Sequence, residues 1–344
     1  MTSPNANATA DVDAEICAEA WVQANQDAYV WTKLPRAAVR SRREGASGTT
    51  TYPVPALNEF MGDVSGLMPW SPGNDVPPPE AIAESTVTIS IKDRATPRTR
   101  AMPLRIDGAH RLARIQNQFV PGELSVLYQG IEAALVNLLS GSAFTSTTWS
   151  GTGTLQANSS ADHTPLADLR GELLPYLKYR SNGRYRLAMI VDQRVLSVLS
   201  GYVEFHGAGA GSGTVSQVSE AVLIDNLKTL LMIDDIYVIR TATESVHAGQ
   251  TSALADVGGG ILWCGLIDAA GSSYDLKTYN DMGPDGALAL GISREPEVVS
   301  WDDEGKEVRY YHGRTEYDVF APRGASNTSD VKFGFFYPSS ENLS

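Results

Sequence analysis

Three stretches between residues 185 and 268 decide the fold: YRLAMIVD at 185–192, IDNLKTLLMIDDIYVIRTATE at 224–244 and GGILWCGLID at 259–268. The first and third are short apolar runs of the length and composition of buried strands. The middle stretch has leucines at helical spacing and then a strand that begins near Asp235. A short helix is predicted directly after the first strand. This alternation of strands and helices predicts a mixed α/β lobe.

A regular helical pattern precedes this lobe. Its apolar residues recur at steps of three and four, as on the buried face of a helix, and include Leu124, Leu127, Ile131, Leu135 and Leu138. Pro121 lies where the first turn of a helix accepts proline, and Gly141 follows the last apolar residue. We predict a long helix over 121–139. A second helix is predicted over 166–179, with Pro175 as a kink or an early end.

The N-terminal region predicts an amphipathic helix from Asp11 to Leu34, limited by Pro35. Trp21 and Trp31 both lie among its apolar positions. An isolated arm with two tryptophans would expose a large apolar surface. The arm must therefore lie either on its own body or on a neighbouring molecule.

The next region looks like a projecting arm. Residues 45–79 contain seven prolines and five glycines, a density that excludes a compact helix or a central strand. The stretch from Val87 to Lys92 then alternates apolar and polar side chains, as one amphipathic strand does. After Pro97 we predict an extended, arginine-rich chain to about Ile115. Long loops of this kind are usually functional or disordered.

The C-terminal region is rich in strands. Glu297–Trp301 and Glu307–Tyr311 flank the turn sequence DDEGK, which predicts a β-hairpin. Further strands are predicted over Arg314–Phe320 and Val331–Tyr337.

The charges divide the chain into two parts. The net charge is −13, which argues against a surface that binds nucleic acid everywhere. From Lys33 to Arg114 there are 12 basic and 8 acidic residues, a local charge of +4, while the remaining 15 basic and 32 acidic residues give −17. Oppositely charged regions of identical copies can dock. The basic part is equally compatible with a solvated loop.

The sequence offers no candidate catalytic, cofactor-binding or metal-ligating residues. The glycine run at 207–213 lacks the spacing and the following lysine of a phosphate loop. The five histidines and the two cysteines, Cys17 and Cys264, stand apart from one another. No apolar run is long enough for a transmembrane helix, and the polar N-terminus does not resemble a secretory signal.

The order of these parts resembles the major capsid proteins of tailed bacteriophages, whose Hong Kong 97-type fold encapsulin nanocompartments share. The resemblance lies in architecture and residue character along nearly the whole chain, most clearly over 184–267 and over 292–337, the latter with SREPEVVSW and TEYDVFAPR. It implies an α+β fold with these parts: an N-terminal arm (1–45), an extended E-loop (46–115), a peripheral domain with a long spine helix (116–180), an axial α/β domain (181–290), and C-terminal strands that return to the peripheral domain and the axial core (291–344).

The resemblance implies a structural protein rather than an enzyme. Copies of the chain would assemble into pentamers and hexamers of an icosahedral head that encloses double-stranded DNA without sequence-specific binding. The chain would be part of the virion, assembled in the host cytoplasm, with no cofactor and no membrane contact. Scaffolding, portal and decoration proteins would be separate partners, because too few residues precede Asp11 for a fused scaffolding domain.

Contacts between subunits are expected from the arm and the basic projection, at Trp21, Trp31, Arg36, Arg40, Arg94, Arg98, Arg100 and Arg105. Some relatives cross-link their subunits through an E-loop lysine. Lys92 is the only lysine of the proposed E-loop and lies at the end of its strand, which argues against such cross-linking.

Three other interpretations remain open. An encapsulin-like shell would have the same fold and a different cargo, and a cytoplasmic hydrolase would assemble its catalytic groups from distant residues. A sugar-binding or adhesion module is a third. Particle size separates these classes, because an enzyme would form a small oligomer and a shell protein would form megadalton particles.

Overall fold

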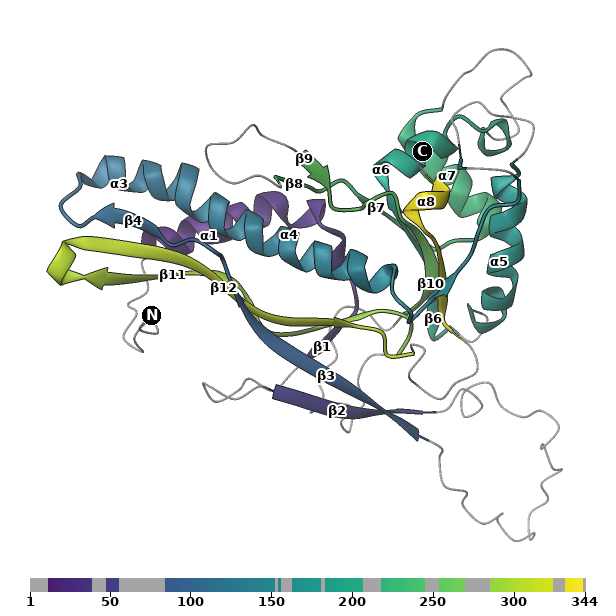
Figure 1. Ribbon diagram of the computed structural model, residues 1–344, viewed down its shortest axis with the longest axis horizontal. Helices are drawn as coiled ribbons and strands as arrows, with labels where there is room; N and C mark the ends of the chain where they lie inside the picture. The colour runs from purple at the N-terminus through teal and green to yellow at the C-terminus, as the bar shows by residue number, and fades with distance from the viewer. Residues whose placement is uncertain are drawn as a thin grey trace, which may run out of the picture.

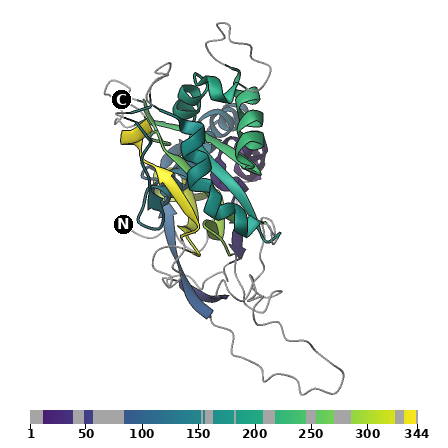
Figure 2. The same cartoon turned by 90° about the vertical axis from the view of Figure 1, so that its right-hand side faces the viewer.

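Two larger sheets organise the chain, and one of them contains a long hairpin that lies beside a long helix (Figure 1). The computed structural model describes residues 12–38, 48–55, 84–151, 154–155, 163–180, 183–206, 218–244, 254–269, 285–323 and 332–342. The molecule is elongated, with the tip of the hairpin at one end and a helix-covered sheet at the other (Figures 1 and 2). Arg40, the glycine run at 207–213 and residues 56–83 of the predicted projection lie outside the described residues.

The helix-covered sheet confirms the α/β lobe. Its strand order is β5 (Thr145–Ser146), β13 (Gly334–Tyr337), β10 (Leu262–Asp268), β6 (Tyr185–Asp192) and β7 (Asp235–Ile239). β6 and β7 are parallel, and β10 runs antiparallel to both β6 and β13. Every residue of β10 is buried, as is every residue of β6 except Arg186, which explains why both strands are continuous apolar runs.

Helices α5 (Pro165–Arg180), α6 (Gln193–Leu199) and α7 (Glu220–Leu231) pack around this sheet (Figures 1 and 2). Pro175 lies inside α5, which continues to Arg180, so the predicted helix is confirmed and not shortened. A short helical turn (Val203–Phe205), the strand pair β8 (Ala242–Glu244) and β9 (Leu254–Asp256), and α8 (Ser339–Asn342) complete this end of the molecule.

The second sheet contains the long hairpin. Its strand order is β1 (Arg36–Ala38), β11 (Ala289–Asp303), β12 (Val308–Phe320), β3 (Glu84–Ala95) and β2 (Gly48–Pro55), with β4 (Arg100–Pro103) also paired to β12. The predicted hairpin is confirmed but is much longer, because β12 is continuous through both predicted strands. β2 and β3 extend away from the rest of the molecule in both views (Figures 1 and 2).

The spine helix α4 (Val120–Leu139) is confirmed, but the chain before it differs from the prediction. Helix α3 (Gly108–Arg114) and a turn of π-helix (Ile115–Phe119) lead directly into α4, where an extended chain was predicted to about Ile115. Buried Ile115 and Phe119 are four residues apart and continue the apolar face of α4. The π-turn lies just before Pro121, which has no N–H for the helical ladder.

The N-terminal helix is shorter than predicted. α1 spans Val12–Asn25, and two turns of 3-10 helix follow at Gln26–Ala28 and Val30–Lys33. Tyr29 separates these turns with an extended backbone, at φ −105° and ψ 132°. The helical spacing of apolar residues across Tyr29 therefore did not correspond to one continuous helix.

Candidate assembly surfaces

The N-terminal arm lies on its own body through a cluster of aromatic rings. Tyr128 of α4 has its ring centroid 5.1 Å from that of Trp21, 5.1 Å from that of Tyr29 and 4.8 Å from that of Trp31. Tilted and edge-on contacts at such distances stabilise aromatic pairs beyond the area that they bury. The arm is thus anchored to the middle of the spine helix.

A buried carboxylate holds the same part of the arm. Glu132 of α4 has no exposed surface, and its two carboxylate oxygens accept the backbone N–H groups of Val30 at 3.0 Å and Trp31 at 3.1 Å. These N–H groups begin a 3-10 turn and would otherwise be buried without partners. Burial raises the pKa of Glu132 to about 7, although the two N–H groups and Lys33 lower it.

This carboxyl group predicts a pH-dependent stability. An unfolded glutamate has a pKa near 4.5, so between pH 4.5 and 7 the folded chain retains a proton that the unfolded chain has lost. The contribution is fully present below pH 4.5 and is lost as the pH rises through 7, by up to about 3 kcal/mol. We expect the unfolding free energy of the wild type, minus that of Glu132→Gln, to fall by this amount in urea titrations from pH 4.5 to 8. A pH-independent difference would contradict the assignment.

Trp31, one of the residues predicted to contact another subunit, lies inside its own chain. Its side chain has no exposed surface, and the Arg36 guanidinium lies 5.9 Å from its ring centroid. A residue that its own chain covers completely has no surface to offer to a neighbour. Trp21 is partly buried and faces Tyr128 and Tyr29. Both tryptophans of the arm therefore pack on the body of their own chain.

The base of the projection is tied to the spine helix by a second buried carboxylate. Glu123 is 2% exposed, accepts a hydrogen bond from Arg100 Nε at 2.8 Å and contacts the hydroxyl of Thr96. The backbone N–H of Gly313 on β12 is directed at both Thr96 and Glu123. A Cβ at Gly313 would lie 2.8 Å from the Thr96 methyl carbon, so this close approach requires glycine.

The strand β3 confirms the predicted amphipathic pattern. Val87, Ile89 and Ile91 are buried and pack with Ala289 and Phe320 of the second sheet. The alternate side chains of Thr88, Ser90 and Lys92 are exposed. β3 therefore presents a polar and basic face outward.

The predicted contact arginines differ in whether they are paired within the chain. Three of them pair within the chain: Arg36 with Glu295 at 2.6 Å, Arg100 with Glu123 at 2.8 Å, and Arg105 with Glu307 at 2.8 Å. Arg94 and Arg98 are exposed and make no ion pair with a described residue. Arg94 and Arg98 are thus the arginines of the set best placed to contact another molecule.

The structure also contains a buried ionic cluster that sequence reasoning missed. Asp285 and Arg323 are 1% and 3% exposed and form a two-point ion pair, with the second contact, between Arg323 Nη2 and Asp285 Oδ2, at 2.9 Å. The Tyr185 hydroxyl donates to Asp285 at 2.7 Å, and Arg184 lies 3.2 Å from the same carboxylate. Burial and then the charge of Asp285 raise the pKa of Tyr185, which keeps this hydroxyl protonated. The two main partners are 38 positions apart, and no local motif connects them.

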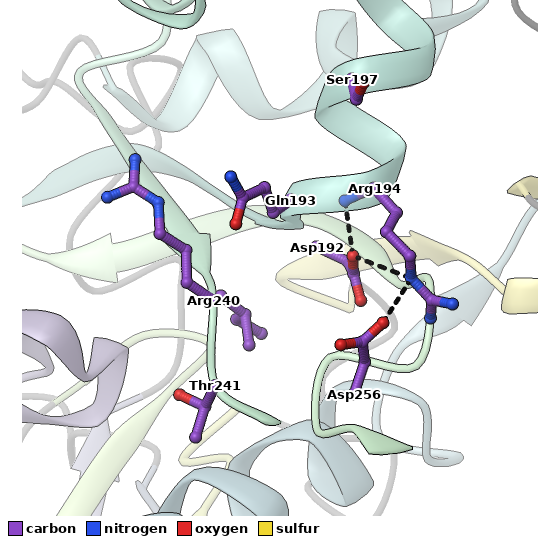
Figure 3. Close-up of a pocket in the computed structure, with 8 residues that line it drawn as sticks. Asp192, Gln193, Arg194, Ser197, Arg240, Thr241 and Asp256 are labelled. Carbon is purple, nitrogen blue, oxygen red and sulfur yellow. Dashed lines mark hydrogen bonds and ion pairs between the residues drawn. The ribbon is translucent and has the colours of Figure 1, made fainter. Parts of the chain in front are cut away.

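A pocket of about 270 Å³ lies at the carboxyl ends of the parallel strands β6 and β7 (Figure 3). Arg194 reaches Asp256 at 2.7 Å, and Asp192 accepts the backbone N–H groups of Arg194 and Gly260. The guanidinium of Arg240 points away from Arg194 and is paired with Glu220 (Figure 3). The charged side chains of the pocket thus already have partners within the chain, and the Arg194–Asp256 pair links α6 to β9.

The described residues lack the features of two other classes of site. No cluster of histidine, cysteine or acidic side chains suited to a metal ion occurs among them. None of the described helices has the length and apolar character needed to span a membrane.

Comparisons with known proteins identify the fold. No protein-family model and no curated protein sequence matches the chain. Among solved structures, it is similar to a phage-related protein from Bordetella bronchiseptica, with a TM-score of 0.57 and 14% identity over 97% of this chain and 98% of that one. The described chain also has the arm, the projecting strand pair, the spine helix, the α/β lobe and the long hairpin in the order that the resemblance implied. The fold is that of the Hong Kong 97-type capsid proteins.

Two other solved structures give lower TM-scores. The capsid protein of mature bacteriophage PhiM1 gives 0.47 at 10% identity, over 89% of this chain and 85% of that one. A virus-like particle from Pyrococcus furiosus gives 0.48 at 9% identity, over 94% of this chain and 98% of that one.

Proposed function

We propose that this chain is the subunit of a closed protein shell built from many copies of itself. The observation that carries the proposal is the Hong Kong 97-type fold of the described residues, with its phage-related structural relative. A fold alone does not fix a function, so the local features matter as well. The projection formed by β2 and β3 supports a shell, because a strand pair that extends from the body is available to neighbouring copies (Figures 1 and 2).

We further propose the phage-head form of this function. Pentamers and hexamers of the chain would form an icosahedral head around double-stranded DNA, as part of a virion assembled in the host cytoplasm with separate scaffolding, portal and decoration proteins. Residues 1–45 would act as the arm, 46–115 as the E-loop, 116–180 as the peripheral domain and 181–290 as the axial domain, and the C-terminal strands of 291–344 would return to the peripheral domain and the axial core. The net charge of −13 would limit tight binding of DNA to the inner wall.

Electron microscopy of the purified full-length chain, with light scattering after size exclusion, tests the shell. We expect closed particles of megadalton mass, or pentamers and hexamers, at micromolar concentration. A stable monomer or a small oligomer under all assembly conditions would overturn the proposal. Neighbouring genes for a terminase, a portal and a head protease would support a phage head, and a neighbouring cargo enzyme without them would favour a nanocompartment.

A further inference from the structure

Helix α1 has two apolar faces, and only one of them is covered. The inner face packs against α4, the π-turn and β11 through Ala14, Cys17, Ala18 and Trp21. On the outer face, Val12 is 63% exposed and Ile16 is 60% exposed. Ala20 and Ala24 are also exposed and continue the same line at steps of four residues. A helix that is apolar on two sides is typical of an element with a second partner.

Acidic side chains run beside this outer stripe. Glu15 and Glu19 are both exposed, and neither forms an ion pair with a described residue. Carboxylates four residues apart on a helix repel each other, so the pair weakens the free helix unless a cation lies nearby. Asp13, the other acid of α1, is 3.8 Å from Arg111. The outer face therefore combines uncovered apolar area with two carboxylates that a basic partner would neutralise.

The same chain presents a basic face of matching spacing. Lys92 and Arg94 are exposed on β3, two positions apart, and therefore lie on one side of the strand. Their separation along a strand is about 6.7 Å, close to the rise of about 6 Å between helix positions four residues apart. Two acidic groups lie nearby. Asp93 lies 3.9 Å from Arg314, and Asp318 accepts the backbone N–H of Ser90 at 2.8 Å. Burial raises the pKa of Asp318, while the Ser90 N–H and the charge of Lys92 lower it. Exposed Arg98 adds a further positive charge.

We propose that the outer face of α1 in one copy receives the basic face of β3 from a second copy, with Glu15 and Glu19 pairing with Lys92 and Arg94. Val12 and Ile16 become buried at this contact. The two surfaces differ, so the contact is head-to-tail, the type that closes into rings when the rotation allows. This inference rests on the proposed function and adds the residues that join the copies.

Charge reversal tests the pairing. The variant Glu15→Lys/Glu19→Lys and the variant Lys92→Glu/Arg94→Glu are each expected to lower the assembled fraction about tenfold at equal concentration. A chain that carries all four changes is expected to recover assembly, because the attraction is restored with reversed sign. Asp225→Lys, at an exposed position of α7, serves as the control and should assemble as the wild type does.

Light scattering and negative-stain microscopy measure assembly, and circular dichroism with thermal unfolding shows that each variant is folded. Ile16→Asp is a further variant, which changes the apolar stripe of α1 and leaves β3 as it is. It should also lose assembly while it keeps the fold. If wild-type particles form and neither reversal changes their yield, or if the fourfold variant stays as defective as the double variants, the contact is overturned while the shell function stands. If the wild type forms no particles, both are overturned.

Discussion

Replacement of Asp285 by alanine is expected to lower the free energy of unfolding by about 3–5 kcal/mol, the usual range when one partner of a buried ion pair is removed. The substitution takes away the carboxylate that faces the Arg323 guanidinium and accepts the Tyr185 hydroxyl. The charge of Arg323 would then remain in a site that is 3% exposed. No rearrangement of surface side chains could compensate for this loss.

Urea denaturation of the wild type and the variant, prepared in the same assembly state, measures the difference. Arg105→Ala is the control, because Arg105 is 82% exposed and its pair with Glu307 lies at the surface. Surface pairs of this kind contribute at most about 1 kcal/mol. Equal, small effects of both substitutions would show that the cluster does not hold the fold together.

Replacement of Trp31 by alanine is expected to lower the unfolding free energy by about 3–5 kcal/mol, as large buried aromatic side chains do. The cavity would lie between the arm and Tyr128, and the N–H groups that reach Glu132 would lose part of their shielding from water. Hydrogen exchange should therefore increase most at residues 29–34. Hydrogen exchange and urea denaturation together separate local release of the arm from global unfolding.

Trp301→Ala is the matched control for this change. Trp301 lies half-buried on the hairpin and stacks on Tyr310 with ring centroids 5.5 Å apart, so its loss should cost only about 1 kcal/mol. An arm that keeps its exchange protection in Trp31→Ala would show that the aromatic cluster does not anchor it.

Much of the fold could be predicted from residues that repeat with a clear period. The stripe from Leu124 to Leu138 predicted the spine helix, and the apolar run at 185–192 predicted β6, because most of the apolar side chains of both elements are buried. The helix α3 was not predicted, since its arginines obscured a helical segment whose residues are all at least partly exposed. A helix that buries little of its own surface leaves no apolar period to detect.

The candidate contact surfaces remain predictions, and α1 shows what its sequence could not decide. Its sequence has apolar residues on two sides, so periodicity could not tell which side faces the body. Trp21 and Trp31 were expected to contact another subunit, but both pack against the ring of Tyr128 in the same chain. Val12 and Ile16 are the large apolar residues of α1 that remain exposed. Ion pairs between residues far apart in the sequence, such as Asp285 and Arg323, depend on the tertiary fold. No local sequence pattern predicts them.

The position of the buried ionic cluster has a mechanical consequence. β11 begins four residues after Asp285, and β12 ends three residues before Arg323. One cluster therefore attaches both strands of the hairpin to the α/β lobe. The 13 residues of β12 span about 43 Å from that fastening toward the distal turn. A rotation of the lobe by a few degrees would therefore displace the distal turn of the hairpin by several ångströms.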